Sequence, residues 1–201
     1  MPESLERQGL PADPFHQFES WLQEVEATGA PYPLAMSLAT ASPTGEVSSR
    51  IVLLRYFDQA GFVFFSATNT LAARQMAANR QVALLFSWLG LERQVKVMGP
   101  AVTLPTSESL RFFASRRRVS QMGTWLAQEN GVISSKSVLR AKWAAIKRQF
   151  RAGQPPMPDF WGGYRVRPQS IEFWQGQPDG LHDRLVYVKQ DAGWEILRLM
   201  P

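Results

Sequence analysis

Short runs of apolar and β-branched residues, separated by turn sequences, occupy most of the chain between residues 33 and 104. The runs "SSRIVLLRYF" and "FVFFS" are joined by "DQAG", which is typical of a β-hairpin. Further strands are expected in "PLAMSLATA", "QVALLFSW", "ERQVKVMGPAVTL", "GGYRVRP", "SIEFWQG", "RLVYVKQ" and "WEILRL". Because most of these strands are joined by short connections, the pattern predicts an antiparallel barrel.

Helical periodicity interrupts the strands at only a few places. Residues 14–28 form the first expected helix, with Asp13 as N-cap and Gly29 as its natural stop. Three more are expected over 70–80, 106–118 and 134–153, with Thr106 as the N-cap of the second of these. The fold class is therefore mainly β with peripheral helices, an α+β chain. Strands and helices do not alternate and no GxGxxG occurs, so a Rossmann sheet is not expected.

The charge balance points to an anionic partner. Lysine and arginine outnumber acidic residues to give a net charge of +5, with a pI of about 9.9. Such a balance suits a nucleic acid or a phosphorylated small molecule, or it is simply a solvated basic surface. The basic run "RAKWAAIKRQFR" reads as one solvated helix face, because no nucleic-acid motif accompanies it.

The chain has no cysteine, which excludes disulfides, thiolate metal sites and cysteine nucleophiles. It begins with a polar segment carrying charges of both signs, and no apolar run approaches the roughly 20 residues that span a bilayer. We therefore expect a cytoplasmic protein with no membrane partner.

The two histidines, His16 and His182, lie at opposite ends of the sequence, so no metal site is expected. His182 follows a Gln-Pro-Asp-Gly turn and precedes Asp183 and Arg184; such a histidine is either a surface residue or a catalytic one. Residues 116–118 are three arginines at the end of an expected helix. They either complement the helix dipole or, with Ser120, bind a phosphate.

Several motifs together resemble the pyridoxamine 5′-phosphate oxidase family. They are "RIVLLR", "LLFSWLGLERQVKVMG", "SRRRVSQMGTW", "FWGGYRV", "IEFWQGQPDGLHDRL" and the closing "GWEILRLMP" with its Arg-Leu-x-Pro ending. The likeness runs almost without gaps from Leu10 to Pro201. We therefore expect one domain over residues 1–201, with residues 1–12 as a flexible segment.

This resemblance implies an FMN-binding split β-barrel homodimer with the flavin at the subunit interface. It implies oxidation of pyridoxamine or pyridoxine 5′-phosphate to pyridoxal 5′-phosphate. A hydride leaves the substrate C4′ for flavin N5, and dioxygen then reoxidises the flavin to give hydrogen peroxide. The cofactor supplies the difficult chemistry, and the protein supplies position and electrostatics.

The resemblance also assigns residues. His182 is the expected catalytic residue, and it binds substrate together with Arg55, Arg116 and Ser120. The expected flavin-binding residues are Arg50, Ile51, Val52, Leu53, Arg55, Phe65, Ser66, Gln94, Trp174 and Arg184. A guanidinium and a hydroxyl can hold a phosphate dianion in a fixed orientation, which makes the Arg116–Ser120 pair physically reasonable.

The chain departs from the family pattern at functional positions. Gly180 replaces an arginine that contacts substrate, and Leu71-Ala72 replaces two cations of the FMN phosphate site. Phe112 replaces a tyrosine of the substrate phosphate clamp, and Glu129-Asn130 replaces a Gln-Ser pair that reaches the flavin. Arg55 replaces a lysine and keeps its charge, and Arg74 lies close to the missing cations on the same expected helix.

Four functions therefore remain open at this point. The first is the FMN-dependent oxidase of phosphorylated B6 vitamers. The second is a related flavin oxidoreductase with another substrate, for which Gly180 and Phe112 leave room. The third is a non-catalytic carrier of flavin or pyridoxal phosphate, which the missing cations favour. A nucleic-acid module explains the charge but not the motifs, so we expect no nucleic-acid partner.

Overall fold

The computed structural model describes residues 4–127 and 131–201 of the chain. Its strands are β1 (Ala35–Ala41), β2 (Val47–Leu53), β3 (Tyr56–Asp58), β4 (Gly61–Ala67), β5 (Gln81–Trp88), β6 (Arg93–Thr103), β7 (Trp161–Val166), β8 (Ser170–Gln175), β9 (Asp183–Gln190) and β10 (Gly193–Arg198). Its α-helices are α1 (Pro14–Ala27), α2 (Leu71–Ala78), α3 (Thr106–Ser115), α4 (Arg118–Trp125) and α5 (Lys136–Gln149). Two 3₁₀ turns, η1 (Arg7–Gly9) and η2 (Leu89–Leu91), complete the elements of the described residues.

The strands form a curled antiparallel sheet. The main path runs β10-β9-β8-β6-β5-β1-β2, and β4 joins β3 to β7, which in turn pairs with β6. Every pairing is antiparallel, and the sheet is a split barrel with helices around it. The predicted fold class is therefore confirmed, and within residues 4–127 and 131–201 no connection has the regular βαβ form of a Rossmann sheet.

Strand β6 belongs to both halves of the split barrel. Its residues 93–98 pair with β8, and its residues 101–103 pair with β7. Gly99 lies at the changeover, where a Cβ atom would lie 2.0 Å from the carbonyl oxygen of Arg167. Only glycine permits this close approach of two backbone segments.

Helix α1 covers one face of the sheet. Asp13 accepts a hydrogen bond from the Phe15 N–H at 2.9 Å, Pro14 occupies the first helical position, and Gly29 ends the segment with a φ of +71°. The apolar side of the helix is buried through Phe15, Phe18, Trp21, Leu22 and Val25. The Phe18 ring packs 4.9 Å from Phe86, and Trp21 packs 5.3 Å from Phe173. The helix therefore closes the hydrophobic core, as its sequence periodicity predicts.

The other face of the same strands stays partly exposed. Directly paired residues share a face, so Ile51, Ser37, Leu85, Lys96 and Glu172 lie in one row across five strands. At the β2 end of this row, the Ile51 side chain is 68% exposed. The alternation along β2 therefore leaves apolar side chains on this face.

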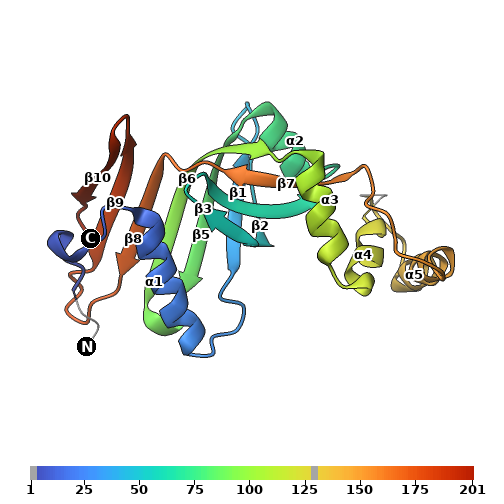
Figure 1. The fold of residues 1–201 in the computed structure, drawn as a ribbon, viewed down its shortest axis with the longest axis horizontal. Coiled ribbons are helices and arrows are strands. Elements are labelled where there is room, and N and C mark those ends of the chain that lie inside the picture. The colour runs from blue at the N-terminus through green and yellow to red at the C-terminus, as the bar shows by residue number, and fades with distance from the viewer. Residues whose placement is uncertain (1–3, 128–130) are drawn as a thin grey trace.

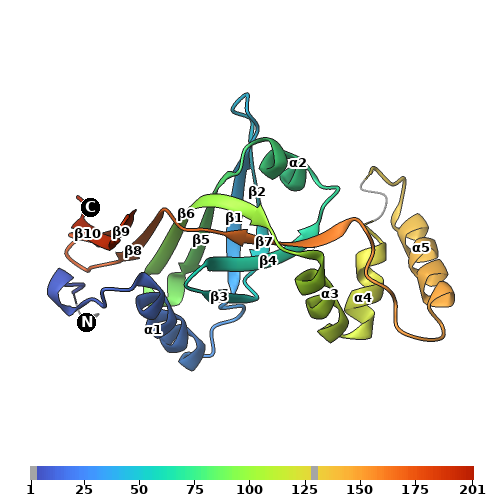
Figure 2. The ribbon, with the colours of Figure 1, turned by 45° about the horizontal axis from the view of Figure 1, so that its top comes forward.

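The two ends of the molecule carry different elements. Figures 1 and 2 show β8, β9 and β10 at one end of the long axis, and α3, α4 and α5 at the other. Helix α2 lies between these two ends, beside β1. No helix of the described residues is long and apolar enough to cross a membrane.

Several local expectations need correction. Helix α3 starts at Thr106 itself, after Pro105, so Thr106 is not the N-cap. The predicted helix over 106–118 is two helices: α3 stops at Ser115, Arg116 caps it in an extended conformation, and α4 starts at Arg118. The run "SSRIVLLRYF" also breaks at Leu54-Arg55 into β2 and β3, since the buried Leu54 turns into the core.

Candidate functional site

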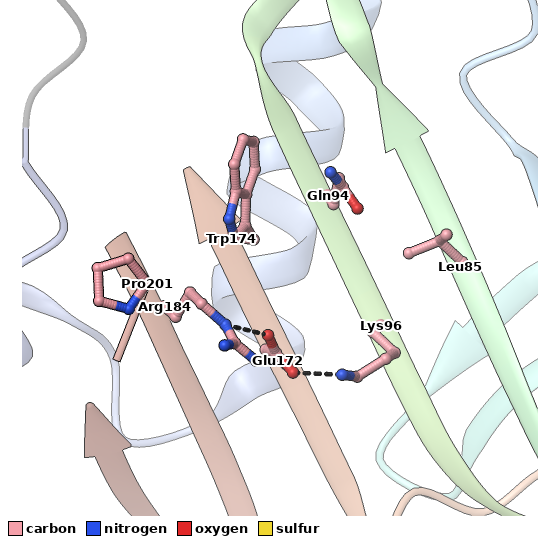
Figure 3. Close-up of a pocket in the computed structure, with 7 residues that line it drawn as sticks. All are labelled: Leu85, Gln94, Lys96, Glu172, Trp174, Arg184 and Pro201. Carbon is pink, nitrogen blue, oxygen red and sulfur yellow. Dashed lines mark hydrogen bonds and ion pairs between the residues drawn. The ribbon is translucent and has the colours of Figure 1, made fainter. Parts of the chain in front are cut away.

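Three of the predicted flavin-binding side chains line one pocket. Gln94, Trp174 and Arg184 are directly paired neighbours on β6, β8 and β9, so the sheet register places them side by side. The pocket has a volume of about 260 Å³ (Figure 3). Its lining consists of Leu85, Gln94, Lys96, Glu172, Trp174, Arg184 and Pro201. It combines an indole, an amide and two cations, a set suited to a planar polar aromatic molecule.

Glu172 binds both cations of this pocket. Its carboxylate lies 2.5 Å from the Lys96 ammonium and 2.9 Å from the Arg184 Nε (Figure 3). Burial alone would raise the pKa of Glu172, but hydrogen bonds from Lys96 and Arg184 outweigh this effect and hold the pKa below its usual value. The carboxylate is therefore ionised at neutral pH and compensates one of the two cations.

His182 lies beside the same pocket, in contact with its tryptophan. The imidazole and the Trp174 ring have centroids 5.0 Å apart. The His182 Nδ1 accepts a hydrogen bond from the Gln177 N–H at 3.1 Å. Because Nδ1 is an acceptor, a neutral ring carries its proton on Nε2 and presents an N–H donor there.

Gly180 forms part of the turn that places His182. The Gly180 N–H donates to the Gln177 carbonyl at 3.1 Å, and the residue has a φ of +79°. A Cβ atom at this position would meet no atom within 4 Å. The space in which an arginine is expected from the family pattern is therefore open, although the backbone conformation favours glycine.

A second cluster contains the predicted phosphate clamp. Arg116 Nη1 donates to the Thr124 hydroxyl at 2.7 Å, and that hydroxyl donates to the Ser120 carbonyl at 3.1 Å. Burial, followed by the charge of Arg55, lowers the pKa of Arg116. Among the described residues, no carboxylate pairs with Arg55 or Arg116. Two neighbouring cations without a counter-charge form a candidate anion site.

An aromatic wall supports this second cluster. Phe65 stacks on Phe112 at 4.1 Å and on Trp161 at 5.1 Å. The guanidinium of Arg55 lies 5.5 Å from the Phe112 centroid, and that of Arg116 lies 5.1 Å from the Trp161 centroid. The Phe65 ring is therefore engaged in this wall. Phe112 contributes an aromatic face without a hydroxyl donor.

Arg50 occupies a third place, between β1 and α2. Its guanidinium donates to the Leu38 carbonyl at 3.2 Å and to the hydroxyls of Thr40 and Ser48. Burial lowers the pKa of Arg50, and no carboxylate of the described residues pairs with it. It is a desolvated cation held by neutral groups, which suits an anionic ligand nearby.

The nearby start of α2 holds the residues that replace the expected cations. Thr70 caps this helix, Leu71 is 49% exposed, and Ala72 is only 7% exposed. Arg74 Nη1 folds back to the Asn69 carbonyl at 3.1 Å. Glu129 and Asn130, the other replaced pair, lie outside the described residues.

The remaining predicted flavin-binding residues lie on β2 and β4, where alternation along the strand decides which face each side chain occupies. On β2, Ile51 and Leu53 point to the exposed face that also carries Leu85, whereas Val52 packs against the core. Ser66 is half-buried on β4, near the start of α2.

Within one chain, the pocket residues and the candidate anion site lie far apart. His182, Trp174 and Arg184 belong to β8, β9 and their connecting turn, whereas Arg116 and Ser120 belong to the α3–α4 region. Figures 1 and 2 place these elements at opposite ends of the long axis. A site that uses both groups therefore needs two copies of the chain.

Comparison with known proteins identifies the family of this chain. The family model described as pyridoxamine 5′-phosphate oxidase matches residues 22–150, and the one described as the pyridoxine 5′-phosphate oxidase C-terminal dimerisation region matches residues 161–201. The chain belongs to the pyridoxamine 5′-phosphate oxidase family. The family resemblance expected from the motifs is thereby confirmed.

Relatives of known name cover nearly the whole chain. The pyridoxine/pyridoxamine 5′-phosphate oxidase of Rippkaea orientalis is 50% identical over 98% of this chain and 93% of its own length. That of Teredinibacter turnerae is 46% identical, with the same coverage. Among solved structures, PhzG from Burkholderia lata 383, in complex with tetrahydrophenazine-1-carboxylic acid, is 26% identical with a TM-score of 0.91, covering 99% of this chain and 98% of that chain.

The sequence did not single out Lys96, Glu172 and Pro201, which line the pocket, or Thr124, which binds Arg116. Two of them carried a detectable signal. Lys96 follows Gln94 by two positions on one strand, and Glu172 precedes Trp174 by two on another, so each shares a face with a predicted flavin residue. Thr124 had no such signal, because the sequence did not predict α4.

Proposed function

We propose that this protein is an FMN-dependent oxidase that converts pyridoxamine or pyridoxine 5′-phosphate to pyridoxal 5′-phosphate. The observation that carries this proposal is the shared pocket of Gln94, Trp174 and Arg184. The family and the names of its relatives agree with this chemistry. When bound, FMN would supply the two-electron acceptor, and dioxygen would reoxidise the reduced flavin while being reduced itself to hydrogen peroxide.

The proposed reaction involves two phosphate groups, one on FMN and one on the substrate, and arginines of this chain are suited to bind each. Arg50 is a desolvated cation near α2 and would bind the FMN phosphate. Arg55, Arg116 and Ser120 would bind the substrate phosphate against the Phe112 face. At the Arg50 site and at the Arg55–Arg116 site, no carboxylate of the described residues pairs with the arginines. Binding of a phosphate dianion is therefore favoured at each site.

His182 would contact the substrate, because it packs against the Trp174 ring, which lines the pocket. Its Nδ1 is already bound to the Gln177 N–H, so its Nε2–H would donate to a substrate oxygen. Arg184 and Gln94 would bind the polar edge of the flavin. Because these groups and Arg116 lie at opposite ends of one chain, the working unit would be a homodimer, which the matched dimerisation region supports.

An absorbance spectrum of the purified protein, followed by FMN titration, tests the cofactor. We expect bound flavin with a dissociation constant at or below micromolar. Peroxide release with pyridoxamine 5′-phosphate then tests the reaction. No flavin binding at high FMN would refute the proposal and leave a non-catalytic barrel.

A second candidate is a flavin oxidoreductase for a larger or less anionic substrate. It is favoured by the open space at Gly180 and by the lack of a hydroxyl on Phe112. The structural likeness to PhzG, solved with an aromatic carboxylic acid, is consistent with it. Flavin binding without peroxide release from either phosphorylated B6 vitamer would favour this candidate.

A further inference from the structure

The segment 199–201, with Arg198 before it, makes contacts that the proposed reaction leaves unexplained. Arg198 Nη1 binds the Asp183 carboxylate at 2.6 Å. The Leu199 N–H donates to the Arg184 carbonyl at 2.8 Å. The Met200 carbonyl accepts from the Arg184 Nη1 at 2.9 Å, and Pro201 lines the flavin pocket. Arg198, Leu199 and Met200 therefore contact Asp183 and Arg184, two adjacent residues of β9.

These contacts fix the Arg184 guanidinium from two sides. Glu172 binds its Nε at 2.9 Å, and the Met200 carbonyl binds its Nη1. A guanidinium is planar, so two bonds at different nitrogens define both its position and the orientation of its plane. Nη2 has no hydrogen-bond partner among the described residues, which leaves its two N–H groups for a ligand. Figure 3 shows Arg184 between Glu172 and Pro201.

The sequence of residues 199–201 favours a backbone contact with Arg184. The Met200 side chain is 83% exposed, so its carbonyl rather than its side chain makes the contact. The residue before a proline is restricted to extended conformations, so Pro201 limits the directions in which the Met200 carbonyl can point. The third position of the Arg-Leu-x-Pro sequence is then free to vary, whereas the proline is not.

The geometry points to residues 199–201 as a positioning segment: its backbone holds Arg184 so that Nη2 faces the flavin. This inference rests on the proposed function, since it assigns the pocket to FMN. The segment acts as a positioning element, because its backbone hydrogen bonds are with Arg184. Ordering this side chain before binding removes part of the entropy cost of binding.

The test measures FMN affinity in three variants of the full protein. A variant lacking residues 199–201 removes the carbonyl and the proline. Pro201→Gly keeps the carbonyl but frees its direction. Met200→Ala is the matched control, because it changes only an exposed side chain. We expect the deletion to raise the FMN dissociation constant roughly ten-fold and Pro201→Gly to raise it by a smaller factor, while Met200→Ala changes it less than about two-fold.

A double variant separates positioning from a general structural role. If the segment acts through Arg184, the deletion adds no further loss of FMN affinity in an Arg184→Ala background. The unfolding temperature and the dimer content of the flavin-free deletion variant should match those of the unmodified protein. A parallel loss of stability or of dimer would overturn the inference in favour of a structural role.

Two further outcomes distinguish failure of this inference from failure of the proposed function. Full FMN affinity in the deletion variant, with weakened affinity in Arg184→Ala, would reject the positioning role and leave the proposed function standing. No FMN binding by the unmodified protein would reject the proposed function and this inference with it.

Discussion

Asp183 and Arg184 are adjacent in sequence but belong to opposite faces of β9 and to different ion pairs. Asp183 is buried and binds Arg198, whereas Arg184 binds Glu172 in the pocket that Trp174 lines. The alternation of a strand produces this separation. The sequence His-Asp-Arg therefore places one buried side chain between two that lie at the Trp174 pocket.

Replacing Asp183 should destabilise the protein. Its carboxylate accepts hydrogen bonds from Arg198, from Gln177 and from the Leu5 N–H, so it joins three segments of the chain. We expect Asp183→Asn to lower the free energy of unfolding by about 2 kcal/mol, because it removes the charge from these bonds. Urea unfolding measures the change. Asp191→Asn, in the exposed β9–β10 turn, serves as the control and should change stability little.

The same carboxylate predicts a pH dependence. Burial alone would raise the pKa of Asp183, but its hydrogen bonds with Arg198, Gln177 and Leu5 outweigh burial and lower the pKa. A lowered pKa gives stability that is present above the unfolded value of about 3.9 and is lost as the pH falls through the folded value. The stability difference between the unmodified protein and Asp183→Asn should therefore shrink below about pH 4. A constant difference down to pH 3 would contradict the assigned charge.

His182→Ala should lower turnover more than flavin affinity. The ring contacts Trp174 at the pocket edge, and its Nε2–H points away from the bond with Gln177. A lost hydrogen bond to substrate corresponds to a decrease in kcat/KM of roughly ten-fold. Steady-state peroxide release and FMN titration measure the two quantities separately. His16→Ala, on the exposed side of α1, is the control. Unchanged kcat/KM in His182→Ala would remove this residue from the site.

Arg116→Ala should raise KM for phosphorylated substrates. Arg116 is half-buried beside Arg55 and is oriented by Thr124, so its loss removes an ordered cation. We expect KM to rise roughly ten- to a hundred-fold, corresponding to about 1.5–3 kcal/mol for a charged hydrogen bond. Arg117→Ala removes the same charge from an exposed neighbour and should leave KM nearly unchanged. Equal effects of the two variants would indicate a general charge effect instead.

The sequence predicted the architecture well, because strands and α1 carry strong periodic signals. The antiparallel barrel and the core face of α1 followed from the strand pattern and helical spacing, whereas the split form of the barrel came from the family resemblance. The break between α3 and α4 did not, because the arginine-rich run 116–118 continues a helical composition. The non-helical backbone of Arg116 and Arg117 divides it. The roles assigned to single residues remain predictions, since strand register and the second copy of the chain decide which side chains meet.

Leu71→Arg should tighten FMN binding. Leu71 is 49% exposed in the first turn of α2, where a new cation would face the proposed phosphate without desolvation. We expect the FMN dissociation constant to fall roughly three- to ten-fold. Adding Ala72→Lys should help less, because Ala72 is 7% exposed and a lysine there must leave a packed position. Ala78→Arg places the same charge at the far end of α2 as a control. No change in affinity for Leu71→Arg would mean that the phosphate lies elsewhere.

Mixing two impaired variants should restore activity, measured at substrate and FMN concentrations where each variant alone turns over little, if the site spans two chains. Arg116→Ala and Arg184→Ala damage groups at opposite ends of one chain, which the proposed homodimer brings together. A heterodimer of the two variants has one doubly damaged site and one intact site. With random pairing, half of the dimers are heterodimers, so about a quarter of the unmodified activity should return.

The matched control mixes Arg116→Ala with Ser120→Ala. These residues belong to the same cluster of one chain, so every site in their heterodimer retains one damaged clamp. Peroxide release from co-expressed, differently tagged subunits measures both mixtures. Recovery only in the Arg116–Arg184 mixture would place the two groups in one shared site. No recovery there, with heterodimers present, would mean that each chain builds its own site or that the two arginines do not act together.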